Sequence, residues 1–490
     1  MKMAQSRQMH EGKMINQSWF SQLGLIVFGV VSVVLLLVTR VQAEPRKEHC
    51  VILVSIDGLA GFYLDDPKAH MPTIRRLAKE GARASGMVSC FPSVTWPAHA
   101  TLSTGVPPAR HGMIGNSYLE RKTGQVVTLL CDPVYEKDQV LKTPTIYDVA
   151  SKAGLKTAGV LWPITRGATT LNWFVPDMPG DDTWEKLGTR SWLQELRAEG
   201  IPVDRHGQWC REPAGGVQRD WLYCRMTAHL IRRYQPNLIL VHLVEPDHVQ
   251  HRTGPRSPEA YWSASYSDDR IRDLIEAVAE SPLAGKTTFI ICSDHGFFPI
   301  TKEIRPNVFL RQKGLIQVKE GKMGSRLAYC LSQGGSSMVY ILDDARRQAL
   351  RRDLHKELAQ IEGVQAVFGP EEFGKIGQPS PEENPWAPDL WLAAESGYSF
   401  SDGLAGEEVV VARQGVGGTH GYLPDQPDML AMCILWGPDV RPGTQLGKVD
   451  ARDIAPTIAR LLGLEMPTAE GRALIQPAAF RPPPVSPAQP

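Results

Sequence analysis

Residues 50–58, CVILVSIDG, form a short, continuous apolar run that ends in Asp57 and Gly58. A run of this length without polar alternation is typical of a strand buried on both faces of a parallel sheet. Runs of the same character follow at 156–163, 237–248 and 287–296. The sequence therefore predicts several buried strands, three of which end in carboxylates.

Segments with helical periodicity separate these runs. They lie at 71–82, 219–234 and 264–280. Strands that alternate with helices predict an α/β fold with a mostly parallel central sheet flanked by helices. In such open sheets, ligands bind beyond the carboxyl ends of the strands.

The pattern changes at 310–405, where a strand–helix–strand unit and a proline-rich loop indicate a small inserted α+β lobe. A strand at 429–437 and a helix at 450–464 then resume the core. We therefore predict a catalytic core from 44–310 and 405–475. The proline-rich end, 476–490, is expected to be a disordered tail.

The N-terminus has the layout of an export signal. Residues 23–38 are apolar and uncharged, basic residues precede them, and Val41 and Ala43 are small residues suited to cleavage after Ala43. The favoured interpretation is a signal peptide at 1–43, and the alternative is an uncleaved anchor at 23–38 in an inner membrane. Either interpretation exports the rest of the chain, to a periplasm or the extracellular space, and no other membrane partner is expected.

The 490 residues carry 53 basic and 53 acidic side chains, so the formal net charge is zero. That balance argues against binding to a nucleic-acid duplex or an anionic membrane surface. Eight cysteines in an exported chain permit disulfides. Cys210 and Cys224 are close enough to suggest one bridge, whereas Cys50 and Cys292 lie in apolar strands and suit buried free thiols.

Residues 90–105, CFPSVTWPAHATLSTG, break at Pro97 and then become helical. Because proline fits the first turn of a helix, Thr95 should lie at or just before a helix N-terminus. Unpaired N–H groups and the helix dipole there favour an anion. The Thr95 hydroxyl is either an ordinary cap or a nucleophile for a phosphate.

Carboxylates and imidazoles follow three predicted strands and occur in one glycine-rich loop. They are Asp57, Asp247, His251, Asp294, His295 and His420. Mixed Asp/His sets suit Zn²⁺ better than Mg²⁺ or Ca²⁺, which prefer oxygen ligands, although Mn²⁺ and iron can use the same residues. Six ligands are too many for one tetrahedral ion, but they suit two ions that share a phosphate.

The motifs SIDG, FPSVTWPAHATLSTG, ARHGMIGN, EPDHVQH, SDHG and GTHGY occur in this order between about residues 50 and 465. Together they resemble the alkaline phosphatase superfamily, and most closely its nucleotide pyrophosphatase/phosphodiesterase (type I phosphodiesterase) branch. The resemblance implies an alkaline-phosphatase-like core with two zinc ions. One zinc site would consist of Asp247, His251 and His420. The other would consist of Asp57, Asp294, His295 and the Thr95 oxygen.

The resemblance also implies roles for residues around the metals. Thr95 would be the nucleophile, and Asn116 would donate a hydrogen bond to a phosphoryl oxygen. Trp96 would either stack on a substrate base or pack the pocket wall. His242 occupies a position where nucleotide-cleaving relatives can carry another stacking aromatic. His99 and His111 are expected to be structural.

The expected function is thus exported, zinc-dependent hydrolysis of phosphodiesters or nucleotide pyrophosphates through a phospho-threonine intermediate, with a small phosphoester or nucleotide as substrate. One alternative is a phosphomonoesterase or phosphonate hydrolase on the same scaffold. A catalytically silent binding protein is a second alternative, but it gives no reason to keep every ligand position. A sulfatase is disfavoured because the Thr95 stretch lacks a Cys-x-Pro-x-Arg pattern.

Overall fold

The computed structural model describes residues 44–131, 134–319 and 322–475, and the described chain from Pro45 onward forms one compact unit. The predicted signal or anchor at 1–43 and the predicted tail at 476–490 lie outside the described residues. Within the described ranges, no helix is both long enough and apolar enough to cross a membrane.

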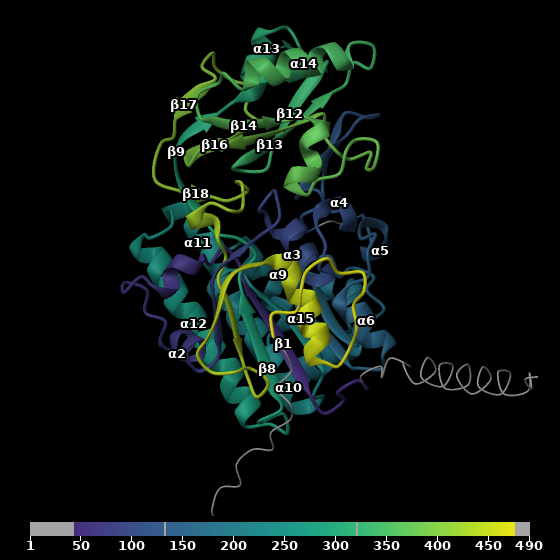
Figure 1. The fold of residues 1–490 in the computed structure, drawn as a ribbon, viewed down its shortest axis with the longest axis vertical. Coiled ribbons are helices and arrows are strands. Elements are labelled where there is room, and N and C mark those ends of the chain that lie inside the picture. The colour runs from purple at the N-terminus through teal and green to yellow at the C-terminus, as the bar shows by residue number, and fades with distance from the viewer. Residues whose placement is uncertain (1–43, 132–133, 320–321, 476–490) are drawn as a thin grey trace, which may run out of the picture. The chain divides into compact units, whose positions relative to one another are not determined.

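An eight-stranded sheet forms the centre of the fold (Figure 1). Its spatial order is β20 (Thr444–Asp450), β2 (Ala82–Val88), β19 (Cys433–Trp436), β8 (Thr287–Cys292), β1 (Cys50–Ile56), β7 (Leu238–Leu243), β5 (Thr157–Trp162) and β6 (Trp173–Pro176). Only β19 runs antiparallel to its neighbours among these strands. The predicted mostly parallel α/β sheet is therefore confirmed.

The register of the central strands brings their carboxyl ends together. Ser55 of β1 pairs with His242 of β7 on one side and with Cys292 of β8 on the other. Side chains that follow these three strands therefore meet at one edge of the sheet.

Both faces of the sheet are covered, which explains the unbroken apolar runs. Alternate side chains of β1 point to opposite faces, so Ile52 and Val54 join one core cluster while Val51 and Leu53 join another. Residues of α2 (Pro72–Glu80), α10 (Gly215–Arg233) and α12 (Pro258–Ala279) line the first cluster. Residues of α3 (Thr95–Thr104), α6 (Ile146–Lys152) and α15 (Ile454–Leu461) line the second.

Local signals fix where several helices begin. The Ser257 hydroxyl accepts a hydrogen bond from the Ala260 N–H, and Pro258 occupies the first turn of α12. At α6, Thr145 and Asp148 form a reciprocal capping box.

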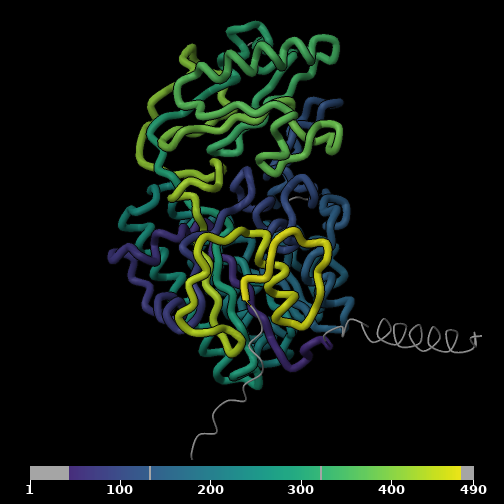
Figure 2. The backbone as a smooth tube through the Cα atoms, viewed as in Figure 1, coloured from purple at the N-terminus to yellow at the C-terminus, as the bar shows by residue number. Residues whose placement is uncertain are grey.

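A second, four-stranded antiparallel sheet lies within the predicted lobe. Its order is β12 (Ala328–Ser332), β13 (Ser336–Ile341), β15 (Leu390–Ala394) and β14 (Val364–Phe368). The predicted strand–helix–strand unit corresponds to β13, α14 (Arg347–Leu358) and β14. Figure 2 follows the chain out of the core after β8 and back into it before β19. The lobe boundaries at 310 and 405 stay a prediction.

Shorter elements lie between these. Near the lobe they are β9 (Phe298–Ile304), α13 (Pro306–Gln312), β10 (Ile316–Lys319), β11 (Lys322–Arg326), η3 (Pro370–Ile376), β16 (Gly397–Phe400), β17 (Val410–Ala412) and β18 (Gly418–Thr419). In the core they are η1 (Gly61–Leu64), α4 (Pro108–His111), β3 (Ser117–Glu120), β4 (Gln125–Thr128), α5 (Lys137–Val140), α7 (Thr183–Leu187), α8 (Arg190–Ala198), η2 (Val203–Arg205), α9 (His206–Arg211), α11 (Glu245–Thr253), η4 (Pro427–Met429) and η5 (Ala451–Asp453).

The predicted disulfide between Cys210 and Cys224 is wrong. All eight cysteines fall within the described residues, and each is a free thiol. The Cys210 sulfur lies 3.4 Å from the His206 ring, whereas the Cys224 thiol points to the carbonyl of Arg270 at 3.8 Å. The expectation of buried free thiols at Cys50 and Cys292 is confirmed, since both lie in the central sheet with no exposed surface.

Candidate active site

The structure brings all six predicted metal-ligand side chains to the carboxyl edge of the central sheet. Asp57 follows β1, Asp294 and His295 follow β8, Asp247 and His251 lie on α11 after β7, and His420 follows β18. Two groups have ligand atoms that all lie within 4.8 Å of one another. They are Asp57, Asp294 and His295, and Asp247, His295 and His420.

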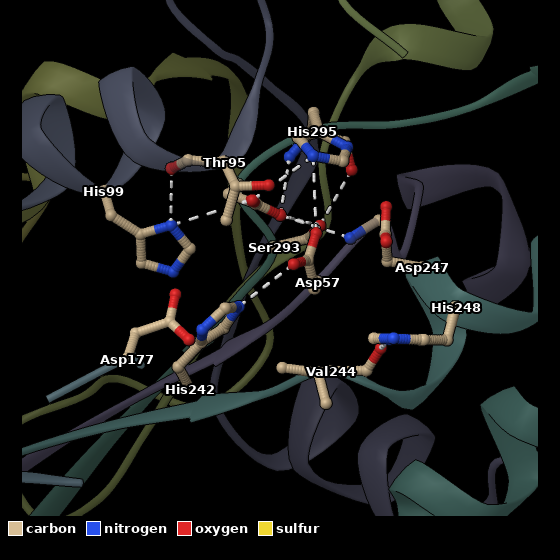
Figure 3. Close-up of polar contacts among 12 residues, drawn as sticks. Asp57, Thr95, His99, Asp177, His242, Val244, Asp247, His248, Ser293 and His295 are labelled. Atoms are coloured by element: carbon tan, nitrogen blue, oxygen red, sulfur yellow. Dashed lines mark hydrogen bonds and ion pairs between the residues drawn. The ribbon is translucent and has the colours of Figure 1, made fainter. Parts of the chain in front are cut away.

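The shortest separations define one continuous centre. His295 Nε2 lies 3.3 Å from both Asp57 Oδ1 and Asp294 Oδ2. Asp247 Oδ1 lies 3.3 Å from His251 Nε2 and 3.5 Å from His420 Nε2. The rings of His295 and His420 stack with centroids 3.8 Å apart, so they join the two groups. Figure 3 shows His295 and Asp247 converging on Asp57.

Each of the three imidazoles is oriented in the same way. The Nδ1 atoms of His251, His295 and His420 lie 3.0–3.1 Å from backbone carbonyl oxygens. Because a carbonyl can only accept, each Nδ1 carries a hydrogen, which leaves Nε2 as the nitrogen through which the neutral ring can bind a metal. A backbone or carboxylate partner on one ring nitrogen is the usual arrangement for a histidine that binds metal through the other.

Several atoms at the centre have no partner in the described protein. Asp57 Oδ1, Asp247 Oδ1, Asp294 Oδ2 and His295 Nε2 are buried and accept no hydrogen bond from a described residue. Leaving such atoms unsatisfied is costly, and more so for charged groups. Four electron-pair donors directed at one small region fit divalent cations, so the residues present suit the predicted metals.

The electrostatics of the centre agree with this fit. Burial, and then the nearby Asp294 and Asp247 carboxylates, raise the pKa of Asp57 well above its usual value. Burial also opposes ionisation of Asp247, but His251, His420 and His295 outweigh it and lower the pKa of Asp247. Burial lowers the pKa of His295 to about 4 and that of His420 to about 3. Both histidines are therefore neutral near pH 7, the form that binds metal.

Thr95 is the first residue of α3, as the sequence predicts. Val94 before it is extended, and the Thr95 carbonyl accepts a hydrogen bond from His99 Nδ1 at 2.7 Å. Figure 3 shows the Thr95 side chain pointing toward His295 and Asp57. The hydroxyl therefore lies between the positive end of a helix and the Asp/His centre.

Asn116 lies against the same helix start. Its Oδ1 accepts a hydrogen bond from the Trp96 N–H at 3.1 Å, and its own N–H donates to Gln333 Oε1 at 2.9 Å. Gln333 comes from the turn between β12 and β13, far away in sequence. No sequence motif marks that turn, so the role of Gln333 was not predictable from the sequence.

His242 has a different position from the one a base-stacking residue needs. Its side chain is 1% exposed, its Nε2 lies 3.1 Å from Asp57 Oδ2, and its ring packs 4.4 Å from that of His99. The possibility that His242 forms a stacking platform is therefore wrong, and the residue positions Asp57 instead.

Trp96 is also largely covered, with 5% of its surface exposed. Its Nε1–H donates to Asp177 Oδ2 at 3.1 Å. Asp177 follows β6 and was not singled out in the sequence, since a lone aspartate after a short strand is an ordinary turn residue. The bond fixes the indole as a wall beside Thr95.

An α/β sheet with a two-part Asp/His centre and a hydroxyl at a helix start fits the class of metal-dependent hydrolases of phosphate esters. Comparison with known families makes this specific. The chain belongs to the type I phosphodiesterase/nucleotide pyrophosphatase family, whose model matches residues 51–423. Members hydrolyse phosphodiester and pyrophosphate bonds and depend on metal, so this protein is a phosphoric ester hydrolase.

Individual relatives agree with the family. Human ectonucleotide pyrophosphatase/phosphodiesterase family member 7 is 24% identical over 440 residues, which cover 86% of this chain and 82% of the relative. A venom phosphodiesterase from Naja atra is 26% identical over 258 residues, which cover 53% of this chain and 27% of the relative. The structure of murine ectonucleotide pyrophosphatase/phosphodiesterase 5 has a similar fold, with a TM-score of 0.64 at 17% identity over 86% of this chain and 96% of that one.

Proposed function

We propose that this chain is an exported, zinc-dependent phosphodiesterase or nucleotide pyrophosphatase that works through a phospho-threonine intermediate on Thr95. The observation that carries the proposal is the position of Thr95, at the start of α3 with its side chain directed toward His295 and Asp57. The N-cap of α3 is Val94 and Thr95 is the first helical residue, so the Thr95 hydroxyl does not occupy the capping position.

Two zinc ions are proposed on the Asp/His centre. Asp247, His251 and His420 would hold one. Asp57, Asp294, His295 and the Thr95 hydroxyl oxygen would hold the other. When bound, the ions would lower the pKa of a coordinated hydroxyl and neutralise charge on phosphate oxygens.

In the proposed reaction, Thr95 Oγ1 gives its proton to solvent water and attacks phosphorus in line with the leaving oxygen. A bond from Thr95 to phosphorus forms as the bond to the leaving oxygen breaks, and the leaving group departs with that electron pair. The Asn116 amide donates a hydrogen bond to an equatorial oxygen, and the positive end of the α3 dipole stabilises the negative charge of that oxygen. Water then cleaves the phospho-threonine, releases a phosphate monoester and restores the hydroxyl.

Names of relatives support the substrate class and the export. One solved neighbour is described as an inactive variant of the murine family member 5 in complex with AMP. Other relatives are ectonucleotide enzymes or venom enzymes. With the signal predicted at 1–43, these names favour a nucleotide-type phosphodiester substrate and a location in the periplasm or outside the cell.

The test is a paired rate measurement on zinc-loaded protein that lacks residues 1–43. One substrate is the p-nitrophenyl ester of thymidine 5′-monophosphate, and the other is p-nitrophenyl phosphate. We expect a large kcat/KM preference for the diester. Acid quenching during turnover of the thymidine ester should also trap the thymidine 5′-monophosphoryl group on Thr95, detected by mass spectrometry. A preference for the monoester, or turnover without this trapped group in single-turnover experiments, would contradict the proposal.

A further inference from the structure

A buried guanidinium close to the candidate active site forms no ion pair with any residue that the structure describes. Arg219, on the second turn of α10, is 8% exposed. Its Nη2 lies 3.1 Å from His248 Nε2, its Nη1 lies 3.8 Å from the Cys210 sulfur, and its Nε is buried with no hydrogen-bond partner in the described chain. None of these contacts is to a carboxylate.

Both contacts of Arg219 are neutral. His248 Nδ1 lies 3.3 Å from the Val244 carbonyl, so that nitrogen carries the ring hydrogen and Nε2 is free to accept from Arg219. Burial raises the pKa of the Cys210 thiol, which keeps it protonated. The positive charge of Arg219 is therefore not neutralised by a group in contact with it.

Two of the nearby acidic groups are engaged elsewhere. Asp220 accepts hydrogen bonds from the N–H groups of Val244 and Glu245 at 2.8 and 3.1 Å. Asp177 accepts the indole hydrogen bond of Trp96. The first turn of α10 contains no acidic residue, so the positive end of this helix adds to the field of Arg219.

Arg219 contacts a residue that lies beside the candidate metal centre. Its partner His248 directly follows Asp247, a proposed zinc ligand. Arg219 also acts electrostatically on Asp177, which holds Trp96 beside Thr95. Figure 3 shows Asp177 and His248 on either side of Val244, next to the Asp/His centre. Arg219 therefore contacts one residue beside the proposed site of reaction, His248, and acts electrostatically on another, Asp177.

We infer that Arg219 binds a second anionic group of the substrate, a phosphate or carboxylate beyond the phosphorus that reacts. The inference rests on the proposed function. An isolated buried charge is costly, and an anion that supplies the missing partner recovers that cost. The planar guanidinium with an unused Nε–H suits the paired oxygens of a phosphate or carboxylate. Substrates with such a group should be preferred over otherwise identical neutral ones.

The experiment compares two matched pairs of substrates. The first pair is the p-nitrophenyl ester of thymidine 5′-monophosphate with and without a 3′-phosphate. The second is p-nitrophenyl phenylphosphonate with and without a 4-carboxylate. The two members of a pair have the same leaving group and differ by one anionic group. The two pairs place that group at different distances from the reacting phosphorus. The proteins are wild type, Arg219→Gln, Arg219→Lys, and Arg225→Gln, which alters an exposed arginine on the same helix.

We expect wild type to prefer the anionic member of at least one pair by about tenfold or more in kcat/KM, mostly through KM. Arg219→Gln should remove that preference while changing the rate on the neutral member less than about threefold, Arg219→Lys should keep part of it, and Arg225→Gln should match wild type. Equal losses on both members would mean that Arg219 only positions α11 through His248, and would overturn the inference. Absence of a wild-type preference in both pairs would also overturn it.

A binding measurement separates this inference from the proposed function. Calorimetry with the Thr95→Ala protein compares thymidine 3′,5′-bisphosphate with thymidine 5′-monophosphate, and 4-carboxyphenylphosphonate with phenylphosphonate, with and without Arg219→Gln. If neither ester is hydrolysed but Arg219 still determines tighter binding of the anionic ligand, the proposed function fails and the inference holds. If the esters are hydrolysed but Arg219 affects neither selectivity nor binding, only the inference fails.

Discussion

The amide oxygen of Asn116 accepts a hydrogen bond from the backbone N–H of Trp96 at 3.1 Å. This bond uses the acceptor of the side chain and one of the N–H groups at the start of α3. The donor end of the Asn116 amide is thereby turned away from Trp96. The same bond connects the loop before β3 to the residue directly after the proposed nucleophile.

Replacing Asn116 by alanine should reduce kcat on a phosphodiester by about 100-fold with little change in KM. The amide would donate to an oxygen whose charge grows in the transition state, so its loss affects the rate more than substrate binding. Steady-state kinetics on the thymidine ester provide the measurement. Ser117→Ala, which removes the neighbouring side chain, is the matched control. A change confined to KM would assign Asn116 to substrate binding alone.

Replacing Thr95 by alanine should lower turnover by at least about 1,000-fold while the metal content stays at the wild-type level. The alanine protein keeps the six Asp/His ligands but has no oxygen to attack phosphorus. Thr95→Ser keeps the hydroxyl and should retain measurable activity. Kinetics and elemental analysis of the same samples give both readouts. Substantial activity in the alanine protein would show that another group attacks.

His295 and His251 should differ in how many metal ions depend on them. His295 belongs to both ligand groups, whereas His251 belongs to neither, approaches Asp247 at 3.3 Å and has a side chain that is 41% exposed. Thus His251→Ala should leave about one zinc per chain, and His295→Ala should leave much less than one.

Elemental analysis after dialysis against a weak chelator measures this difference, with exposed His70→Ala as the control. Full removal of metal by a strong chelator should abolish activity in all of the proteins, and added zinc should restore it in wild type. Loss of both ions from the His251 protein would contradict two separable sites.

His111 should make the protein less stable in acid. Its Nδ1 accepts the Met113 N–H at 3.1 Å, and its Nε2 lies 3.0 Å from the Thr101 hydroxyl, which itself donates to the Pro97 carbonyl. The buried ring is therefore neutral, and burial lowers its pKa from 6.5 to about 3. Between these two values the unfolded state binds more protons, so the free energy of unfolding falls as the pH falls from about 6.5 toward about 3.

Urea unfolding at several pH values tests this. The free energy of unfolding should depend less steeply on pH in His111→Asn. The slope should fall by up to the contribution of about one bound proton, which is ~1.4 kcal/mol per pH unit. His70→Asn, which changes an exposed histidine, should leave the slope as in wild type. An unchanged slope in the His111 protein would mean that this histidine does not contribute to the acid sensitivity.

The strands and the Asp/His centre were predictable because each depends on local sequence. Because both faces of β1 are covered, the strand within the run at 50–58 is apolar. Asp57 directly follows that strand, so it lies at the edge of the sheet. The contacts around His242 were not predictable in this way. Its side chain could point to the substrate or to Asp57, and only the packing against His99 decides between them.

Hydrogen-bond partners that are far apart in the sequence were not predictable for the same reason. Gln333 reaches Asn116 from the turn between β12 and β13, and Arg219 reaches His248 between two helices. The predicted Cys210–Cys224 bridge was wrong because proximity along the chain says nothing about the direction of side chains on α9 and α10.

The chain leaves the core sheet at the end of β8 and returns through β19, and these two strands pair antiparallel with Cys292 opposite Cys433. The whole segment between them therefore has its two ends side by side, as in a very long hairpin. A segment anchored in this way can be replaced as a block without changing the order of the strands in the sheet. Exchanging it between relatives would offer a modular route to new substrate preferences, provided that the graft keeps the Asp294–His295 pair and His420, which lie close to its two ends.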